Sequence, residues 1–182
     1  MTHLFVTNDF PPKVGGIQTM LWELWRRLDP SSFAVLTTPY DGDRAWDAAQ
    51  PYRVVRAGAK VLLPTPALAR RIDELADEVG ATHVVLDPAL PVGLVGPRLQ
   101  HPYAVVLHGA EITVPGRLPG SNLLLRYVLR GAGLVIAAGG YPLAEGERAA
   151  GRALPSVLVP PGVDTDRFVP LGEGERAGGR AR

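Results

Sequence analysis

Residues 3–18 read His-Leu-Phe-Val-Thr-Asn-Asp-Phe-Pro-Pro-Lys-Val-Gly-Gly-Ile-Gln, which is a short apolar run, a polar loop and a pair of glycines. The apolar run, 3–7, has the length and composition of a buried β-strand. Directly after the glycines, apolar residues recur at three- and four-residue spacing from Met20 to Leu28, so they would share one face of a helix beginning at Gly16. A strand joined to a helix in this way is the first half of a βαβ unit, which predicts a parallel sheet.

The same alternation of short β-rich runs and helical segments continues along the chain. Several of the runs are apolar throughout, as expected of strands that helices cover on both faces. We therefore expect an open, doubly wound, mostly parallel Rossmann-like α/β domain. The expected strands are 3–7, 33–37, 52–56, 83–86, 104–107, 134–138 and 156–159, and the expected helices are 16–28, 66–79, 92–99, 122–130 and 142–150.

Composition limits the classes of function. The chain has 182 residues, 46% of them hydrophobic, which suffices for one packed core. Its 19 Lys and Arg and 18 Asp and Glu give a net charge of +1, which argues against nucleic acid as a partner because that binding neutralises many phosphates at once. The absence of cysteine excludes disulfides, zinc–thiolate sites, iron–sulfur clusters and a thiol nucleophile. No apolar stretch reaches the roughly 18–20 residues of a bilayer span. All basic residues except Lys13 and Lys60 are arginine, a skew that indicates a GC-rich bacterial source.

Ligands of doubly wound sheets bind outside the carboxyl ends of the strands, so the loops after the first and fifth strands are the candidate sites. In the first loop Gly15 and Gly16 precede a helix, whose free N–H groups and dipole favour an anion such as a pyrophosphate. The alternative is a plain turn, the commoner meaning of a Gly-Gly pair. Because the spacing matches neither the dinucleotide fingerprint nor the P-loop, no NAD or ATP site is predicted.

The second loop begins with His-Gly-Ala-Glu at 108–111, directly after strand 104–107. An imidazole at the mouth of the crevice can donate a hydrogen bond to a sugar hydroxyl or to a developing charge. The alternative is a structural histidine whose nitrogens are satisfied by backbone carbonyls. We expect His3, His83 and His101, which lack such a setting, to be structural. The spacing of histidines and carboxylates matches no metal-ligand pattern, so no metal is expected.

Four segments together resemble glycosyltransferase family four. They are Thr-Asn-Asp-Phe-Pro-Pro at 7–12, Gly-Gly-Ile-Gln at 15–18, His-Gly-Ala-Glu at 108–111 and Val-Pro-Pro-Gly-Val-Asp-Thr-Asp-Arg-Phe at 159–168. Within that family the first two are most similar to the bacterial GDP-mannose-dependent phosphatidylinositol mannosyltransferases, especially those that add the second mannose. The resemblance implies a GT-B architecture, in which two Rossmann-like lobes face each other across a cleft. Residues 1–160 would form the acceptor-side lobe, and 161–182 would form the crossover and the start of a missing donor-binding lobe.

The resemblance also implies roles for individual residues. Gly16 would bring its N–H to the donor pyrophosphate, Gly15 would permit that approach, and His108 would contact the transferred sugar and help hold an oxocarbenium-like transition state. The reaction would be a retaining transfer from a sugar nucleotide, GDP-mannose, without a cofactor or a metal, and the isolated lobe would be inactive. Weaker candidates for contacts to the acceptor hydroxyls are Asn8, Asp9, Gln18, Glu111 and Thr113.

A phosphatidylinositol mannoside as glycolipid acceptor implies a cytoplasmic enzyme in peripheral contact with the inner membrane leaflet. Two surfaces could make this contact, one on helix 66–79 and one around helix 122–130. Acidic residues on helix 66–79 count against the first surface, and leucines at the spacing found in both surfaces more commonly belong to the core. Two other functions remain open: transfer from a UDP-sugar or to a soluble acceptor, and a non-catalytic sugar- or lipid-binding module. The candidate surfaces are Arg70 and Arg71 with Leu62, Leu63 and Leu68, and Arg117 with Leu118, Leu123, Leu124 and Leu125.

Overall fold

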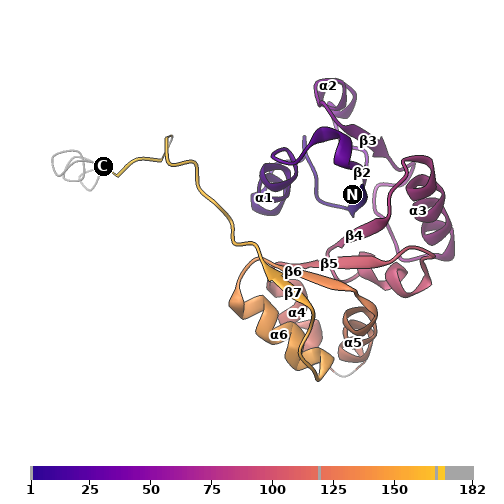
Figure 1. Cartoon of the computed structure of the whole chain (residues 1–182), viewed down its shortest axis with the longest axis vertical. Coiled ribbons are helices and arrows are strands. Elements are labelled where there is room, and N and C mark those ends of the chain that lie inside the picture. Colours follow the sequence, from indigo (N-terminus) through magenta and orange to yellow (C-terminus); the bar gives the residue numbers. More distant parts are fainter. Residues whose placement is uncertain (1, 119, 167, 171–182) are drawn as a thin grey trace.

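A single parallel sheet organises the chain, whose computed structural model describes residues 2–118, 120–166 and 168–170 (Figure 1). Its seven strands lie in the order β3-β2-β1-β4-β5-β6-β7, and every neighbouring pair is parallel. The predicted fold class is thereby confirmed, and each expected strand is present with ends that differ by at most one residue. The strands are β1 (His3–Thr7), β2 (Phe33–Thr37), β3 (Arg53–Arg56), β4 (His83–Asp87), β5 (Tyr103–Leu107), β6 (Leu134–Ala137) and β7 (Ser156–Leu158).

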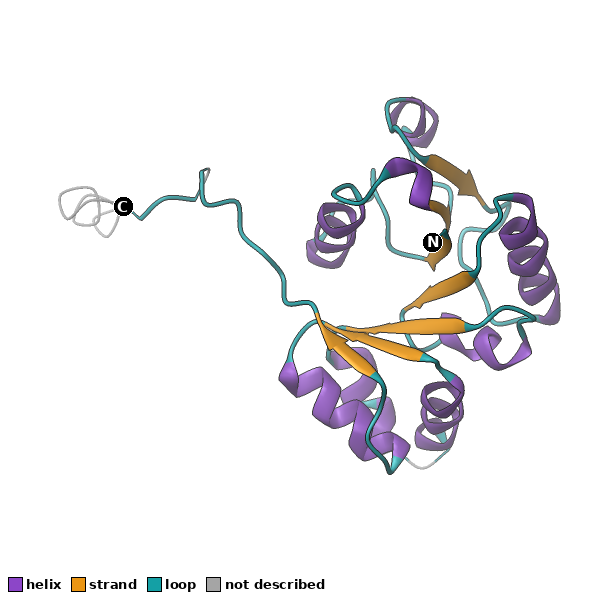
Figure 2. Ribbon diagram, viewed as in Figure 1, coloured by secondary structure: helices purple, strands orange, loops and turns teal. Residues whose placement is uncertain are grey.

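Helices cover the two faces of the sheet unequally (Figure 2). One face buries the larger core cluster beneath α3 (Pro66–Glu78), η2 (Val92–Arg98), α4 (Ala110–Thr113), α5 (Ser121–Gly131) and α6 (Gly140–Ala150). The other face packs against α1 (Gly16–Trp25) and α2 (Asp43–Ala48) through a smaller, aromatic cluster. In that cluster Phe5 of β1 stacks on Trp25 with ring centroids 3.8 Å apart. Two short 3-10 turns complete the described elements, η1 (Pro30–Ser32) and η3 (Pro115–Arg117).

Most expected helices are present, with three differences. The first helix ends at Trp25 rather than at Leu28, because the following residues continue as turns. Segment 92–99 forms the 3-10 helix η2 instead of an α-helix, since two glycines and Pro97 interrupt it. A Cβ added to Gly96 would lie 2.5 Å from the Tyr103 ring, so close packing keeps this position small. The short helices α2 and α4 were not predicted.

The chain leaves the sheet after β7, at the edge of the molecule (Figure 1). Residues 160–166 and 168–170 are exposed. Most of the tail that the sequence assigns to the start of a second lobe, 171–182, lies outside the described residues. Among the helices that the structure describes, none combines the length and the apolar content needed to cross a bilayer.

Candidate functional site

The strand order reverses between β1 and β4, and this switch point lies in the middle of the sheet. β1 is followed by β2 on one side, whereas β4 and β5 extend the sheet on the other. The strands are parallel, so the loops after β1, β4 and β5 all emerge at the same edge. In register, the last residue of β1, Thr7, lies beside the last residue of β4, Asp87. Both candidate loops are therefore placed at the expected ligand crevice.

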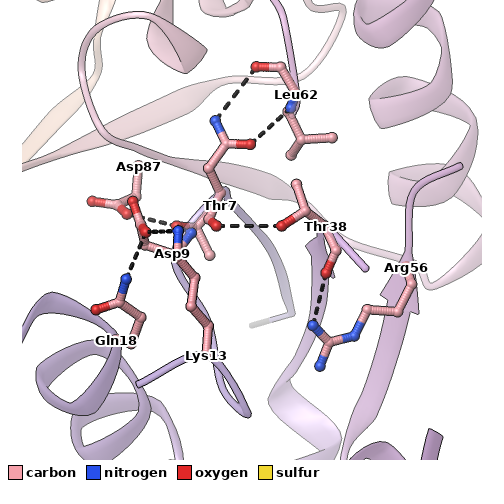
Figure 3. A network of polar contacts seen from close by, with 9 residues as sticks. Thr7, Asp9, Lys13, Gln18, Thr38, Arg56, Leu62 and Asp87 are labelled. Atoms are coloured by element: carbon pink, nitrogen blue, oxygen red, sulfur yellow. Dashed lines mark hydrogen bonds and ion pairs between the residues drawn. The ribbon is translucent and has the colours of Figure 1, made fainter. Parts of the chain in front are cut away.

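Asp87, which is fully buried, links the two candidate loops, and Figure 3 shows its contact with Thr7, where the first loop begins. Its Oδ2 accepts a hydrogen bond of 2.7 Å from the Thr7 hydroxyl, and its Oδ1 lies 2.5 Å from Nε2 of His108. The Thr7 hydroxyl in turn accepts a 2.9 Å bond from the backbone N–H of Asp9. Burial raises the pKa of Asp87, and the contacts with His108 and Thr7 oppose that rise. Asp87 was not among the site residues predicted from the sequence.

His108 lies directly after β5, at the carboxyl edge of the sheet, and its side chain is only 10% exposed. An ionised carboxylate only accepts hydrogen bonds, so beside ionised Asp87 the proton of neutral His108 resides on Nε2. The contact therefore sets both the orientation of the ring and its tautomer.

Asp9 is the centre of a second group of polar contacts in the first loop (Figure 3). Its Oδ1 accepts hydrogen bonds from Lys13 Nζ and from Gln18 Nε2, each 2.7 Å long. Gln18 lies on α1 and is buried, so it ties the helix to the loop. Asn8 is engaged elsewhere, because its Oδ1 accepts a 2.7 Å bond from the backbone N–H of Leu62. The structure thus gives Gln18 and Asn8 supporting contacts within the lobe, and their contact with an acceptor stays a prediction.

Gly15 and Gly16 stand at the start of α1 beside an open groove of about 720 Å³. The groove lies between α1 and the segment that follows β7, where residues 159–164 and Phe168 line it. A Cβ on Gly15 would come within 2.2 Å of the Gln18 Oε1 atom, whereas a Cβ on Gly16 would meet no atom within 4 Å. Gly15 is the N-cap residue of α1, and no side chain there accepts a hydrogen bond from the N–H groups of the first turn. The first turn of the helix therefore faces space in which an anion would fit.

Thr113 lies at the end of α4, the short helix that follows His108. Its hydroxyl donates a 3.0 Å bond to the Gly109 carbonyl and lies 3.3 Å from the hydroxyl of Tyr141 on α6. Tyr141, which the sequence analysis did not consider, therefore borders the second loop. The backbone of Glu111 belongs to α4, but its side chain falls outside the described part of the structure.

The other histidines make contacts within the fold. His3 Nε2 accepts a 2.9 Å bond from the Trp25 indole, and His101 lies within 3.2 Å of Asp73 and Asp77. Over residues 2–118, 120–166 and 168–170, no three histidine, aspartate or glutamate side chains converge as a metal site would require.

The fold is that of the N-terminal, Rossmann-like lobe of GT-B glycosyltransferases. Anabaena HepE, solved in complex with UDP-glucose, superposes with a TM-score of 0.65 at 20% identity and covers 100% of this chain and 49% of its own. Sucrose-phosphate synthase from Thermosynechococcus elongatus gives a TM-score of 0.63 at 15% identity, over 98% of this chain and 53% of its own. These likenesses concern the fold. No protein-family model matches the chain.

Sequence relatives narrow this class. The chain is 36% identical over 175 residues to the GDP-mannose-dependent alpha-(1-6)-phosphatidylinositol monomannoside mannosyltransferase of Mycobacterium tuberculosis. It is 33% identical over 171 residues to the Corynebacterium glutamicum enzyme that acts on the monoacylated form. Each match covers 91% of this chain and 45% of the enzyme, so the chain spans about half the length of these relatives. The chain is a homologue of the phosphatidylinositol mannoside mannosyltransferases of glycosyltransferase family four, over the N-terminal half of those enzymes.

Proposed function

We propose that the chain is the acceptor-side lobe of a retaining glycosyltransferase that transfers mannose from GDP-mannose to a phosphatidylinositol mannoside. The observation that carries the proposal is the identity of 36% to a relative whose name specifies this donor and this acceptor. The placement of Gly16 and His108 at one edge of the sheet supports it. In this proposal residues 1–160 form the lobe, residues 161–182 lead into a donor-binding lobe, and the enzyme works at the cytoplasmic face of the membrane.

The proposed chemistry divides the work between the two loops. The first turn of α1, with the N–H of Gly16, binds the pyrophosphate of the donor. His108, held by Asp87, contacts the mannose and stabilises charge that develops as the bond between C1 and the phosphate oxygen breaks. The acceptor hydroxyl attacks C1 from the face that the diphosphate leaves, and the departing phosphate oxygen takes the hydroxyl proton. Neither a protein base nor a metal is required in this scheme.

Acceptor recognition is proposed to come from the same two loops. Asp9 is the strongest candidate, since its side chain is 27% exposed and a carboxylate accepts hydrogen bonds from sugar or inositol hydroxyls. Gln18 would act through Asp9, which it holds at 2.7 Å. Asn8, Glu111 and Thr113 remain further candidates on the two loops.

The test joins this lobe to the donor-binding lobe of the C. glutamicum relative. The fusion is incubated with membranes that contain mono-mannosylated phosphatidylinositol and with radiolabelled GDP-mannose, and in parallel with radiolabelled UDP-glucose. We expect label to pass from GDP-mannose into a more mannosylated lipid. Label that passes only from UDP-glucose, or only into a water-soluble product, would contradict the donor or the lipid assignment.

His108 provides the sharper test of the site. His108→Ala should lower the transfer rate about 100- to 1,000-fold, the usual effect of removing a group that stabilises transition-state charge. His83→Ala is the matched control. His83 begins β4, at the end opposite to Asp87, and contacts the Thr82 hydroxyl, so it lies away from the candidate site. Equal rates for the two variants would make His108 a structural residue. The lobe without a donor-binding lobe should give no transfer. If the fusion binds the sugar nucleotide but does not transfer the sugar, a non-catalytic binding module would be favoured instead.

A further inference from the structure

The helix α5 carries large apolar side chains on its solvent side as well as on its core side. Leu123 is 66% exposed and Tyr127 is 56% exposed, one turn apart on the same face. Leu125, by contrast, is fully buried in the core, so the sequence-based assignment of Leu125 to a membrane surface is wrong. The exposed set, called the α5 patch below, comprises Leu118, Leu123, Leu124 and Tyr127 with Arg117, Arg126 and Arg130.

The charge of the α5 patch is positive. Residues 112–144 contain three arginines and no aspartate or glutamate. Arg126 and Arg130 are one turn apart and alternate with Leu123 and Tyr127 on the exposed face of the helix. Arg117, whose side chain is 62% exposed, lies 3.6 Å from the carboxylate of Glu145 on α6. Leucine and tyrosine interspersed with arginine are the side chains that proteins present to the boundary between lipid headgroups and acyl chains.

We propose that the α5 patch docks this protein on the surface of an anionic phospholipid bilayer. The leucines would enter the headgroup boundary while the arginines pair with lipid phosphates. The inference rests on the proposed function for its biological meaning, because a lipid acceptor must be reached at a membrane. α4 and η3 connect His108 directly to the start of α5, and Asn122 Nδ2 donates a 2.5 Å bond to the Gly116 carbonyl that fixes this connection. A bilayer held at the patch would thus adjoin the second loop of the site.

The other surface considered from the sequence, on α3, differs chiefly in its charge. Leu62 is 2% exposed and therefore belongs to the core, whereas Leu63 is 59% exposed. Arg71 lies 3.8 Å from Glu74, and the exposed side of α3 also carries Asp77 and Glu78. The helix α3 has two arginines against four acidic residues and is net acidic, whereas the three arginines of the α5 patch outnumber Glu145, so α3 supplies a matched control surface.

The first experiment measures binding of the 182-residue chain to vesicles by sedimentation. One set of vesicles is phosphatidylcholine with about 30% phosphatidylglycerol, and the other is phosphatidylcholine alone. We expect binding to the anionic vesicles that weakens as salt is added. The double variant Leu123→Asn, Leu124→Asn should lower the partition coefficient about tenfold or more. Arg126→Gln should lower it about fivefold and reduce its salt dependence. The control variant Arg70→Gln, Arg71→Gln should bind as the wild type does.

A second measurement keeps the proposal testable if a variant unfolds. Tyr127→Trp adds a fourth tryptophan, in the patch. The emission of this variant minus that of the wild type should shift to shorter wavelength with anionic vesicles but not with phosphatidylcholine alone. No shift, or equal binding of the Leu123→Asn, Leu124→Asn variant with native circular dichroism, would overturn the proposal. So would a dimer in sedimentation velocity that this variant dissociates, because the patch would then be an interface between copies of the chain. These vesicles contain neither acceptor nor sugar nucleotide, so the docking result is independent of the transfer assay.

Discussion

Gly15 and Gly16 are adjacent, yet replacing them with alanine should change the stability of the chain in opposite directions. The backbone at Gly15 is extended, with φ at 169°, so an alanine there suffers no backbone strain. Its Cβ would, however, come within 2.2 Å of Gln18 Oε1 and force that side chain away. At Gly16 an added Cβ would meet no atom within 4 Å. The pair therefore separates the structural role of the loop from its proposed role in binding the donor.

The expected stability changes follow from these contacts. Displacing Gln18 removes its 2.7 Å bond to the Asp9 carboxylate, which costs about 1.5–3 kcal/mol. The stiffer unfolded chain offsets about 0.4–1 kcal/mol of this loss, so Gly15→Ala should lower the free energy of unfolding by about 0.5–2.6 kcal/mol. For a domain of this size Tm changes by about 2–4 °C per kcal/mol, so Tm should fall by about 1–10 °C. In Gly16→Ala only the favourable change in the unfolded chain remains, so Tm should rise by up to about 4 °C.

Thermal unfolding followed by circular dichroism measures both changes on the 182-residue chain. Binding of GDP-mannose to the fusion with a donor lobe measures the functional effect. There Gly16→Ala should weaken binding about tenfold or more, because its Cβ would stand between the helix N–H groups and the pyrophosphate. A Gly16→Ala variant that is more stable and binds GDP-mannose as the wild type does would show that the glycine pair is only a turn. A Gly15→Ala variant as stable as the wild type would refute the role given to Gln18.

Two further predictions concern buried ionisable groups. Asp87→Asn keeps the shape of the side chain but can present an amide donor to Nε2 of His108, so the ring proton should move to Nδ1 and transfer by the fusion should fall about a hundredfold. Nitrogen chemical shifts of His108 report the tautomer. Burial raises the pKa of Asp87 in the folded chain, so the free energy of unfolding decreases as pH rises through that pKa. Asp87→Asn does not titrate, so its Tm at neutral pH should be no lower than that of the wild type. His3, next to Trp25, has a pKa lowered by burial and then by His83. As pH falls, His3 is therefore protonated in the unfolded chain before it is protonated in the folded chain. Tm should then fall as pH drops below about 6.5. His3→Gln keeps an acceptor that does not titrate, so an equally steep fall in that variant would contradict the assignment.

The sheet could be predicted from the sequence because parallel strands covered on both faces must be apolar throughout. Runs such as 33–37 therefore differ from the amphipathic helices around them. The prediction of an α-helix over 92–99 was wrong because its apolar spacing suits a helix, whereas Gly93, Gly96 and Pro97 interrupt it. The packing of Gly96 against the ring of Tyr103 cannot be read from sequence spacing. The helix α2 is only six residues long and buries none of them, so it has no apolar face that a periodicity could reveal.

The candidate site was predictable only where it follows from chain order. The loops at Gly15 and His108 could be located because each follows a recognisable strand. Asp87 also ends a strand, but a carboxylate there is usually solvated, and its role depends on β4 lying between β1 and β5. That strand order is expected of a doubly wound sheet, in which the fourth strand pairs with the first. Applying the order to the sequence would have placed Asp87 between the two loops.

Asp87 fixes the position of the two loops relative to each other, because both loops contact this one residue of the sheet. β1 and β5 are separated by β4, a distance of about 10 Å between their axes, which is too far for direct hydrogen bonds between their terminal side chains. Thr7 and His108 both contact Asp87 instead, and the hydroxyl of Thr7 also holds the N–H of Asp9. The register of three hydrogen-bonded strands thus fixes where the imidazole stands relative to the first loop. In the proposed glycosyltransferase, a transition state that needs both loops would find this half of the site already arranged, so binding of the donor would have to order only the approach of the proposed second lobe.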